Sequence, residues 1–166
     1  MFDEIEFKNN IQSKYITEYG AEIGEVFCRI FERSLNNDIL DDLFNEIEKF
    51  GFFDREKFDK KYLVETNIIE SKNAMISAII KESKYNEHFM TWEKGSEFLE
   101  KFLNQFDRIE NVYQNAYWEK STSNNSYKDE LDMMGWSGIS KYNYYDYGFV
   151  IISERKIGIL WFGDDS

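Results

Sequence analysis

The sequence contains no proline, one cysteine and one histidine. Without proline, no backbone segment carries that ring constraint, so element boundaries must be read from Gly, Asn, Asp and Ser. Cys28 alone cannot form an internal disulfide, and a structural zinc site requires several Cys or His ligands at set spacings. These absences exclude disulfide-stabilised scaffolds and common zinc sites, and they fit a reducing compartment.

Basic charge is also scarce, because 20 Lys and Arg stand against 32 Asp and Glu and leave a net charge of −12. Binding nucleic acid or anionic lipid requires clustered cations that displace counterions, so we expect no direct contact with nucleic acid and none with membranes. No apolar run approaches the roughly 18 residues of a membrane span, and the first residues are acidic where a secretory signal is basic. We therefore expect a cytoplasmic protein whose partner is a basic protein.

Apolar residues, in contrast, are plentiful. With 42% hydrophobic and 18% aromatic residues, the chain of 166 residues can bury a sizeable core, which excludes intrinsic disorder as the main state. This length suits one domain. We expect a single domain over 1–166, with a helical part at about 1–120, a loop at about 121–128 and a β part at about 135–163.

Apolar residues recur at three-four spacing along the first two-thirds of the chain, as on one face of a helix. The segments with this spacing are 3–18, 21–35, 39–50 and 96–118, with shorter stretches that follow Asp54 and Ser71. Residues 21–35 match the spacing best, and Asn36, Asn37 and Asp38 then provide a turn and an N-cap. The pattern predicts a helical hairpin over 21–50.

The period changes after the polar loop at 121–126. Residues 147–153 and 156–162 are rich in β-branched and aromatic residues and are separated by a short charged turn, which predicts a β-hairpin. A third strand near 139–145 would give this hairpin a partner. The predicted fold class is α+β, with a mainly helical N-terminal two-thirds followed by a small C-terminal antiparallel sheet that contains a β-hairpin.

The residues that could carry out chemistry lack companions. His88 belongs to no metal or general-base motif, and Cys28 borders an apolar stripe where a thiol acts as a small hydrophobe. Asp164 and Asp165 are expected to be solvated charge. Residues 135–138 lack the lysine and the helix of a phosphate-binding loop. We therefore predict no catalytic residue, no metal site, no cofactor and no enzymatic activity.

Negative charge is concentrated in the first 50 residues, which hold 12 acidic and five basic residues. In a helical hairpin these acids would lie opposite the apolar stripe and at the start of the second helix. Such a surface is either the solvated side of the hairpin or a binding surface for a cationic partner. The acidic residues predicted to contact a partner are Glu18, Glu22, Glu25, Asp38, Asp41 and Asp42.

A second candidate surface is aromatic. Tyr and Trp are frequent at interface hot spots because each provides a large, stiff contact area with one polar group. The residues predicted to contact a partner are Trp136, Tyr142, Tyr144 and Tyr145. On a strand, Tyr142 and Tyr144 would point to one face and Tyr145 to the other, so at least one set is expected to be exposed.

The C-terminal segment, from Tyr147 through Ile152 and on through Ile157 to Asp165, resembles the ending of several small acidic immunity proteins of bacterial polymorphic toxin systems. About a fifth of the chain carries this resemblance, and no functional residue is transferred on it. The resemblance implies a cytoplasmic protein that binds the toxic domain of an effector, often a basic nuclease, and blocks it. Sequence leaves the oligomeric state unknown.

Two alternatives remain open. A phage-encoded acidic inhibitor could mimic nucleic acid towards a defence nuclease, and rows of acids spaced like phosphates would favour it. An enzyme would require a pocket that joins His88 to carboxylates. A mixed acidic and aromatic patch favours a dedicated protein inhibitor instead.

Overall fold

The computed structural model describes residues 1–34, 36, 38–82 and 87–165. The described elements, in chain order, are α1 (Glu4–Gln12), the 3₁₀ helix η1 (Ser13–Tyr15), β1 (Gly24–Glu32), α2 (Ile39–Ile47), the 3₁₀ helix η2 (Lys60–Tyr62), β2 (Val64–Thr66), α3 (Ile68–Ile80), β3 (Lys81–Glu82), β4 (Glu87–His88), α4 (Trp92–Leu103), β5 (Ile109–Gln114), β6 (Ala116–Lys120), β7 (Leu131–Trp136), β8 (Tyr145–Ser153) and β9 (Lys156–Asp164).

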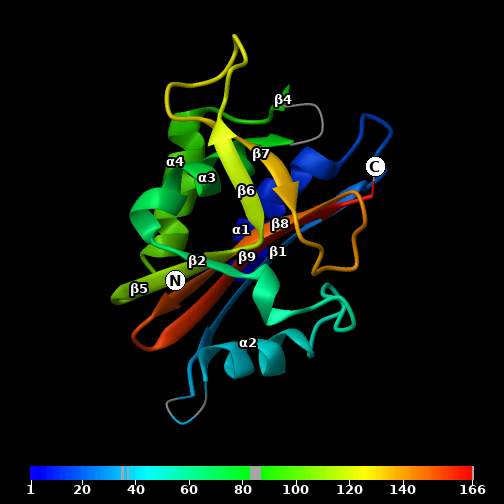
Figure 1. Ribbon diagram of the computed structural model, residues 1–166. Coiled ribbons are helices and arrows are strands. Elements are labelled where there is room, and N and C mark those ends of the chain that lie inside the picture. Colours follow the sequence, from blue (N-terminus) through cyan, green and yellow to red (C-terminus); the bar gives the residue numbers. More distant parts are fainter. Residues whose placement is uncertain (35, 37, 83–86, 166) are drawn as a thin grey trace.

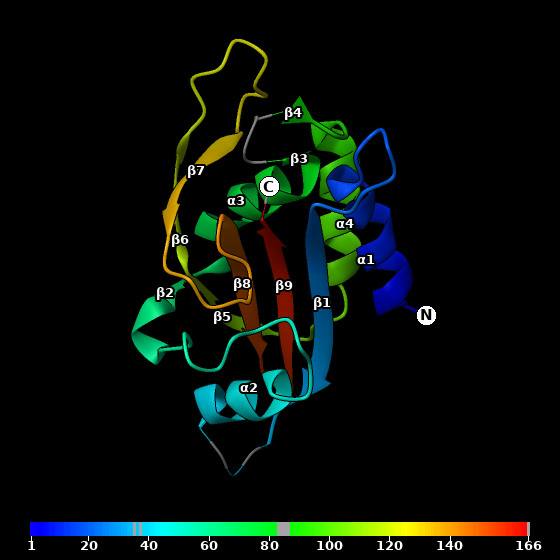
Figure 2. The ribbon, with the colours of Figure 1, turned by 90° about the vertical axis from the view of Figure 1, so that its right-hand side faces the viewer.

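An antiparallel five-stranded sheet with the order β1-β9-β8-β5-β2 forms the centre of the molecule (Figures 1 and 2). The predicted hairpin is confirmed as β8 and β9. Its neighbours are β1, which pairs with β9 over its whole length, and β5, which pairs with β8. The pairs β3-β4 and β6-β7 form two further small sheets.

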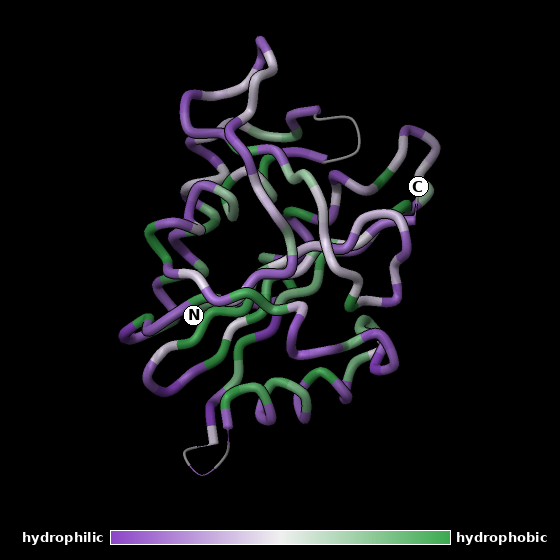
Figure 3. The backbone as a smooth tube through the Cα atoms, in the orientation of Figure 1, coloured by the Kyte–Doolittle hydropathy of each residue, from purple (hydrophilic) through white to green (hydrophobic). Residues whose placement is uncertain are grey.

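Both faces of the sheet are covered, with α1, α3 and α4 on one side and α2 on the other (Figure 1). Along β1, Val26 packs into the core between the sheet and α1, α3 and α4, and Phe27 packs into the core between the sheet and α2. Figure 3 shows hydrophobic segments gathered in the sheet and the elements packed on it, while the peripheral loops are hydrophilic. Strands buried on both faces carry runs of apolar residues instead of alternating ones.

The prediction of a mainly helical N-terminal two-thirds is wrong, because helices are short and strands begin at Gly24. The segment 21–35, which matched helical spacing best, contains β1. A strand buried on both faces can place apolar residues side by side, so Val26-Phe27 and Ile30-Phe31 imitate a helical period. The helical hairpin is therefore a strand followed by α2; Leu35 and Asn37 lie outside the described residues.

The predicted helix over 96–118 is also wrong beyond its first turns. α4 ends at Leu103, and β5 and β6 follow. Val112 pairs with Ile151 across the sheet, so pairing with β8 overrides the helical spacing of this segment. The predicted third strand near 139–145 is wrong too, because 139–144 forms a loop with one bridge from Ser140.

Several local signals are confirmed. Asp38 is the N-cap of α2, and its side chain accepts a hydrogen bond from the Leu40 N–H at 2.8 Å. The polar segment 121–126 forms no helix or strand. α3, however, begins at an Asn67 cap instead of at Ser71. An N-cap depends on one side chain and the backbone N–H groups next to it, so it can be predicted even where the spacing of apolar residues over a longer segment predicts the wrong element.

β1 is an edge strand whose free backbone groups are covered by side chains of α1. The Gln12 amide donates to the Gly24 carbonyl at 2.6 Å and accepts from the Val26 N–H at 2.6 Å. The Glu4 carboxylate accepts from the Ile30 N–H at 2.8 Å. These bonds take the place of a further strand, which blocks edge-to-edge pairing, and they hold α1 along β1 from Gly24 to Ile30.

Candidate functional site

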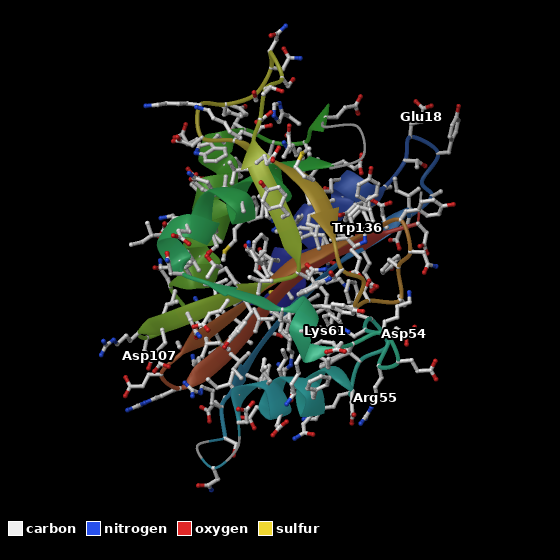
Figure 4. All side chains as sticks on the ribbon, in the orientation of Figure 1. Glu18, Asp54, Arg55, Lys61, Asp107 and Trp136 are labelled. Atoms are coloured by element: carbon white, nitrogen blue, oxygen red, sulfur yellow. The ribbon has the colours of Figure 1, made fainter. Side chains whose placement is uncertain are left out.

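Seven of the predicted contact residues lie at one end of the sheet, around the C-terminal end of β9 (Figure 4, where Glu18 and Trp136 are labelled). Gly24 of β1 and Tyr145 of β8 both pair with Asp164. Together with the exposed Asp165, these seven residues form a set that we call the acidic–aromatic rim: Glu18, Glu22, Glu25, Trp136, Tyr142, Tyr144, Tyr145 and Asp165.

Hydrogen bonds join the segments that carry the rim. The Asp165 N–H donates to the Ile23 carbonyl at 3.2 Å, and the Asp165 carboxylate accepts from the Asn143 N–H at 2.8 Å. Glu18 lies on a turn in which Gly20 adopts a φ of 80°, a left-handed conformation that favours glycine. The turn is closed by the Thr17 N–H and the Ala21 carbonyl at 2.8 Å, and it holds Glu18 in solvent.

A buried carboxylate holds the loop 139–144 in place. The Asp146 side chain accepts from the backbone N–H of Ile139 at 2.5 Å, from that of Ser140 at 2.7 Å and from the Trp161 indole at 2.6 Å. Burial raises the pKa of Asp146, although the three donors act in the opposite direction. The loop that presents Tyr142 is therefore anchored to the hairpin.

A groove of about 560 Å³ lies within the rim, between α1, the start of β1 and the loop 139–144. Its lining includes Lys8, Glu22, Glu25, Lys141, Tyr142 and Asp165. The Tyr142 hydroxyl donates to Glu25 Oε2 at 3.1 Å, and Lys141 Nζ lies 3.6 Å from the same oxygen. Burial and the negative charges of Glu25, Asp165 and Glu22 raise the pKa of Tyr142, which keeps its hydroxyl a donor.

The exposed rings of the rim differ in their surroundings. The Tyr144 side chain is 60% exposed, and Trp136 is 37% exposed while it stacks on the Tyr145 ring at a centroid distance of 5.2 Å. Tyr147, in contrast, is fully buried. The strand alternation predicted for 142–145 is wrong because only Tyr145 belongs to a strand, and loop geometry decides which rings reach solvent.

The other three predicted acids lie at the start of α2, beyond the opposite end of β1 (Figure 1). Asp38 caps the helix, and Asp42 is buried and accepts from the Ser34 N–H at 2.8 Å. Asp41 pairs with Lys60 at 3.0 Å. The structure therefore does not bring these acids together with Glu18, Glu22 and Glu25, and local structure accounts for their positions.

Sequence reasoning missed a buried ion-pair network that includes His88. Lys81 Nζ lies 2.8 Å from Glu130 Oε2 and 2.5 Å from Asp132 Oδ1. His88 Nε2 lies 2.6 Å from Glu130 Oε1, which also accepts from the Tyr127 N–H at 3.1 Å. The two carboxylates lie 42 to 51 positions after the basic residues that they contact and form no motif with them, so no sequence signal marks the network.

This network ties β3 and β4 to β7. Although burial acts to raise it, the pKa of Glu130 is lowered by hydrogen bonds from Lys81, the Tyr127 N–H and His88. Both carboxylate oxygens of Glu130 have donors at bonding distance, and the side chains of Lys81 and Glu130 are almost fully buried. The arrangement suits a structural tie more than a general acid or base.

The remaining reactive groups do not form a second site in the described part of the chain. Burial raises the pKa of Cys28, so its thiol is not ionised at neutral pH. Asp164 was expected to be solvated but is buried on β9, and Asp165 alone of the two is exposed. Within residues 1–34, 36, 38–82 and 87–165, no three His, Cys, Asp or Glu side chains are placed to hold a metal ion.

Comparison with known proteins finds no matching family model, no matching curated protein and no matching solved structure. In the part of the chain that the structure describes, no helix has both the length and the apolar character needed to cross a membrane. The functional interpretation therefore depends on the geometry and charge of the rim.

Proposed function

We propose that this protein binds a cationic protein partner and blocks it, as a cytoplasmic immunity protein or antitoxin blocks a toxin domain such as a nuclease. The observation that carries the proposal is the rim, where three acidic side chains of 18–25 lie at the same end of the sheet as the exposed rings of Trp136 and Tyr144. Carboxylates attract a basic partner, and rings provide desolvated contact area. The net charge of −12 extends that attraction beyond the rim.

Mimicry of nucleic acid towards a defence nuclease is the second candidate. It requires rows of carboxylates spaced like phosphates. The rim instead mixes acids with rings, and Lys8 and Lys141 line its groove. This mixture supports a dedicated protein inhibitor over a mimic. His88 does contact a carboxylate, as the enzyme alternative requires, but the Glu130 side chain is almost fully buried and ion-paired with Lys81, which favours a structural role for this contact.

The proposal is tested with the protein encoded beside this chain's gene. A neighbouring reading frame that ends in a basic toxin domain should yield a domain that forms a one-to-one complex with this protein and loses activity in proportion to the amount added. Calorimetry gives the stoichiometry, and the toxin assay gives the inhibition. A toxin domain that stays active and unbound at micromolar concentrations of this protein would contradict the proposal.

Charge on the rim is expected to set the speed of partner capture. The double variant Glu18→Gln/Glu22→Gln preserves shape, and both side chains are exposed. Association should slow by roughly three- to tenfold at low salt, with a flatter salt dependence and a smaller change in dissociation. Glu56→Gln/Glu154→Gln removes the same charge from exposed sites outside the rim. Equal slowing by both pairs in stopped-flow measurements would show that only net charge matters.

Rings on the rim are expected to set the lifetime of the complex. Trp136→Ala and Tyr144→Ala should each cost about 2 kcal/mol of binding, on the order of thirtyfold in affinity, mostly through faster dissociation. Tyr144 is 60% exposed, so its removal should hardly change the melting temperature. Tyr117→Ala removes a ring that is 61% exposed on β6, outside the rim, and serves as the control. Dissociation that changes no more than in Tyr117→Ala would remove these rings from the interface.

A further inference from the structure

The residues that line the groove within the rim indicate which kind of partner side chain binds there. This inference rests on the proposed function. We infer that this groove receives an arginine side chain, whose guanidinium stacks on the Tyr142 ring and pairs with the Glu25 carboxylate. The partner is thus a basic protein that presents an arginine on the surface that contacts the rim.

The first observation is the shape and chemistry of the groove. Its volume of about 560 Å³ exceeds that of an arginine side chain. Tyr142 lines the groove, its ring packs on Gly163 and has Lys141 Nζ over it, and its hydroxyl donates to Glu25 Oε2 at 3.1 Å. A ring face beside an oriented carboxylate is the arrangement that a guanidinium binds through stacking and charge-assisted hydrogen bonds.

The second observation is that a lysine of the chain itself already lies close to both the Glu25 carboxylate and the Tyr142 ring. Lys141 Nζ lies 3.6 Å from Glu25 Oε2 and 5.4 Å from the centroid of the Tyr142 ring. The Lys141 side chain is 49% exposed, and an exposed ion pair contributes only about 0–1 kcal/mol. Lys141 therefore marks the position of a cation in the free protein and can be displaced at small cost.

Arginine suits this position better than a second lysine does. Its planar guanidinium stacks on an aromatic face, is more weakly hydrated than an ammonium group and offers five donors. Within the described residues, the carboxylate of Glu22 has neither an ion pair nor a hydrogen bond, so it is available as a further acceptor beside Glu25. The Asp165 carboxylate also faces the groove, although it accepts from the Asn143 N–H.

The test uses small probes in place of the unidentified partner. Nα-acetyl-L-arginine amide, the corresponding lysine amide and the uncharged citrulline amide are titrated into the full chain, and amide shifts are followed by NMR. We expect the arginine probe to shift residues 22–25 and 141–145, with an affinity about tenfold above that for citrulline and clearly above that for lysine. Equal affinities for the three probes, or shifts confined to other regions, would overturn the inference.

Variants of the groove make the test specific. Lys141→Met vacates the cation position and should raise the affinity for the arginine probe several-fold. Lys8→Met removes the same charge from the groove lining without freeing Glu25, so it should raise the affinity less. Glu25→Gln and Tyr142→Leu should lower the affinity by about tenfold or more while thermal melting reports whether each variant is folded. An equal gain in Lys141→Met and Lys8→Met would show that net charge alone is responsible, against the inference.

The outcome is separable from that of the proposed function. A toxin domain that is inhibited through the rim while the arginine probe does not bind would overturn the arginine groove and leave the inhibitor function standing. A probe that binds as described, together with a neighbouring toxin domain that remains active, would support the groove and contradict the function.

Discussion

Replacing Lys81 with Met should lower the free energy of unfolding by about 3–5 kcal/mol. The ammonium group is fully buried and lies between the carboxylates of Glu130 and Asp132. Its removal leaves Glu130 as a buried negative charge, and among the described residues its side chain then keeps the His88 ring and the Tyr127 N–H as partners. Burial of a charge without a compensating cation is among the costliest changes that one substitution can make.

Lys72→Met is the matched control, because it breaks an ion pair of similar length at the surface. Lys72 and Glu100 lie 2.7 Å apart with both side chains about half exposed, so the loss should be about 0–1 kcal/mol. Urea denaturation of both variants measures the difference. The double variant Lys81→Met/Glu130→Gln should recover part of the stability, since it removes the unpaired charge. A cost for Lys81→Met no greater than for Lys72→Met would show that the network does not stabilise the fold.

The network also connects the interior to the rim. Glu130 directly precedes the strand β7 that ends at Trp136, Asp132 belongs to this strand, and Lys81 begins β3 directly after α3. Loss of the tie should therefore loosen β7 as well as the global fold, because the Trp136 ring is held by the position of β7 against Tyr145. Lys81→Met is therefore expected to weaken partner binding indirectly, through the displaced Trp136 ring.

Local signals in the sequence predicted local structure well. The side chain of Asp38 caps α2, and the β-branched and aromatic run from 147 to 162 forms the hairpin, because caps and hairpins depend on neighbouring residues. The strand β1 could not be predicted in this way. Its apolar residues serve two cores, and its partner β9 lies more than 120 residues further along the chain. The pattern alone cannot separate such a strand from an amphipathic helix.

Sequence patterns identified residues of the candidate site but could not predict how these residues are arranged. Charge and aromatic content identified Glu22, Glu25 and Tyr142, and the structure places all three around one groove. The hydrogen bond between Tyr142 and Glu25 joins residues 117 positions apart, so nothing in the sequence could show it. The acids at the start of α2 would share a surface with these residues only in a helical hairpin, and the structure has the strand β1 in place of the first helix.

The buried Lys14 is expected to make stability depend on pH above neutrality. Its Nζ donates to the carbonyls of Ala78 at 2.5 Å and of Lys81 at 3.0 Å. Burial lowers the pKa of Lys14 from 10.5 to about 7, and the charges of Glu82 and Asp164 oppose this shift only in part. In the unfolded chain the same lysine is solvated and keeps a pKa near 10.4.

Between about pH 7 and pH 10 the unfolded state therefore binds one more proton at Lys14 than the folded state does. Lys14 alone should therefore raise the free energy of unfolding with pH across this window, by up to about 4 kcal/mol, since each pH unit contributes at most about 1.4 kcal/mol. Cys28 acts against this rise from about pH 8.5, because burial raises the pKa of the folded thiol and the unfolded thiol therefore ionises first. Above pH 10 the sign reverses for Tyr15, whose pKa burial raises well above 10, because the unfolded tyrosine then loses its proton first. The rise from Lys14 is thus offset by Cys28 above about pH 8.5 and overtaken above pH 10, so the increase in stability should be confined to about pH 7 to 9.

Urea denaturation from pH 6.5 to pH 10.5 measures this profile. Lys14→Gln keeps a donor for the two carbonyls but does not titrate, so its free energy of unfolding should lose the rise between pH 7 and pH 9. Lys72→Gln removes an exposed lysine and should keep the rise. The same slope in Lys14→Gln as in the unmodified chain would contradict the assignment, because another group would then release the proton. A loss of slope confined to Lys14→Gln would identify Lys14 as the group that folding deprotonates.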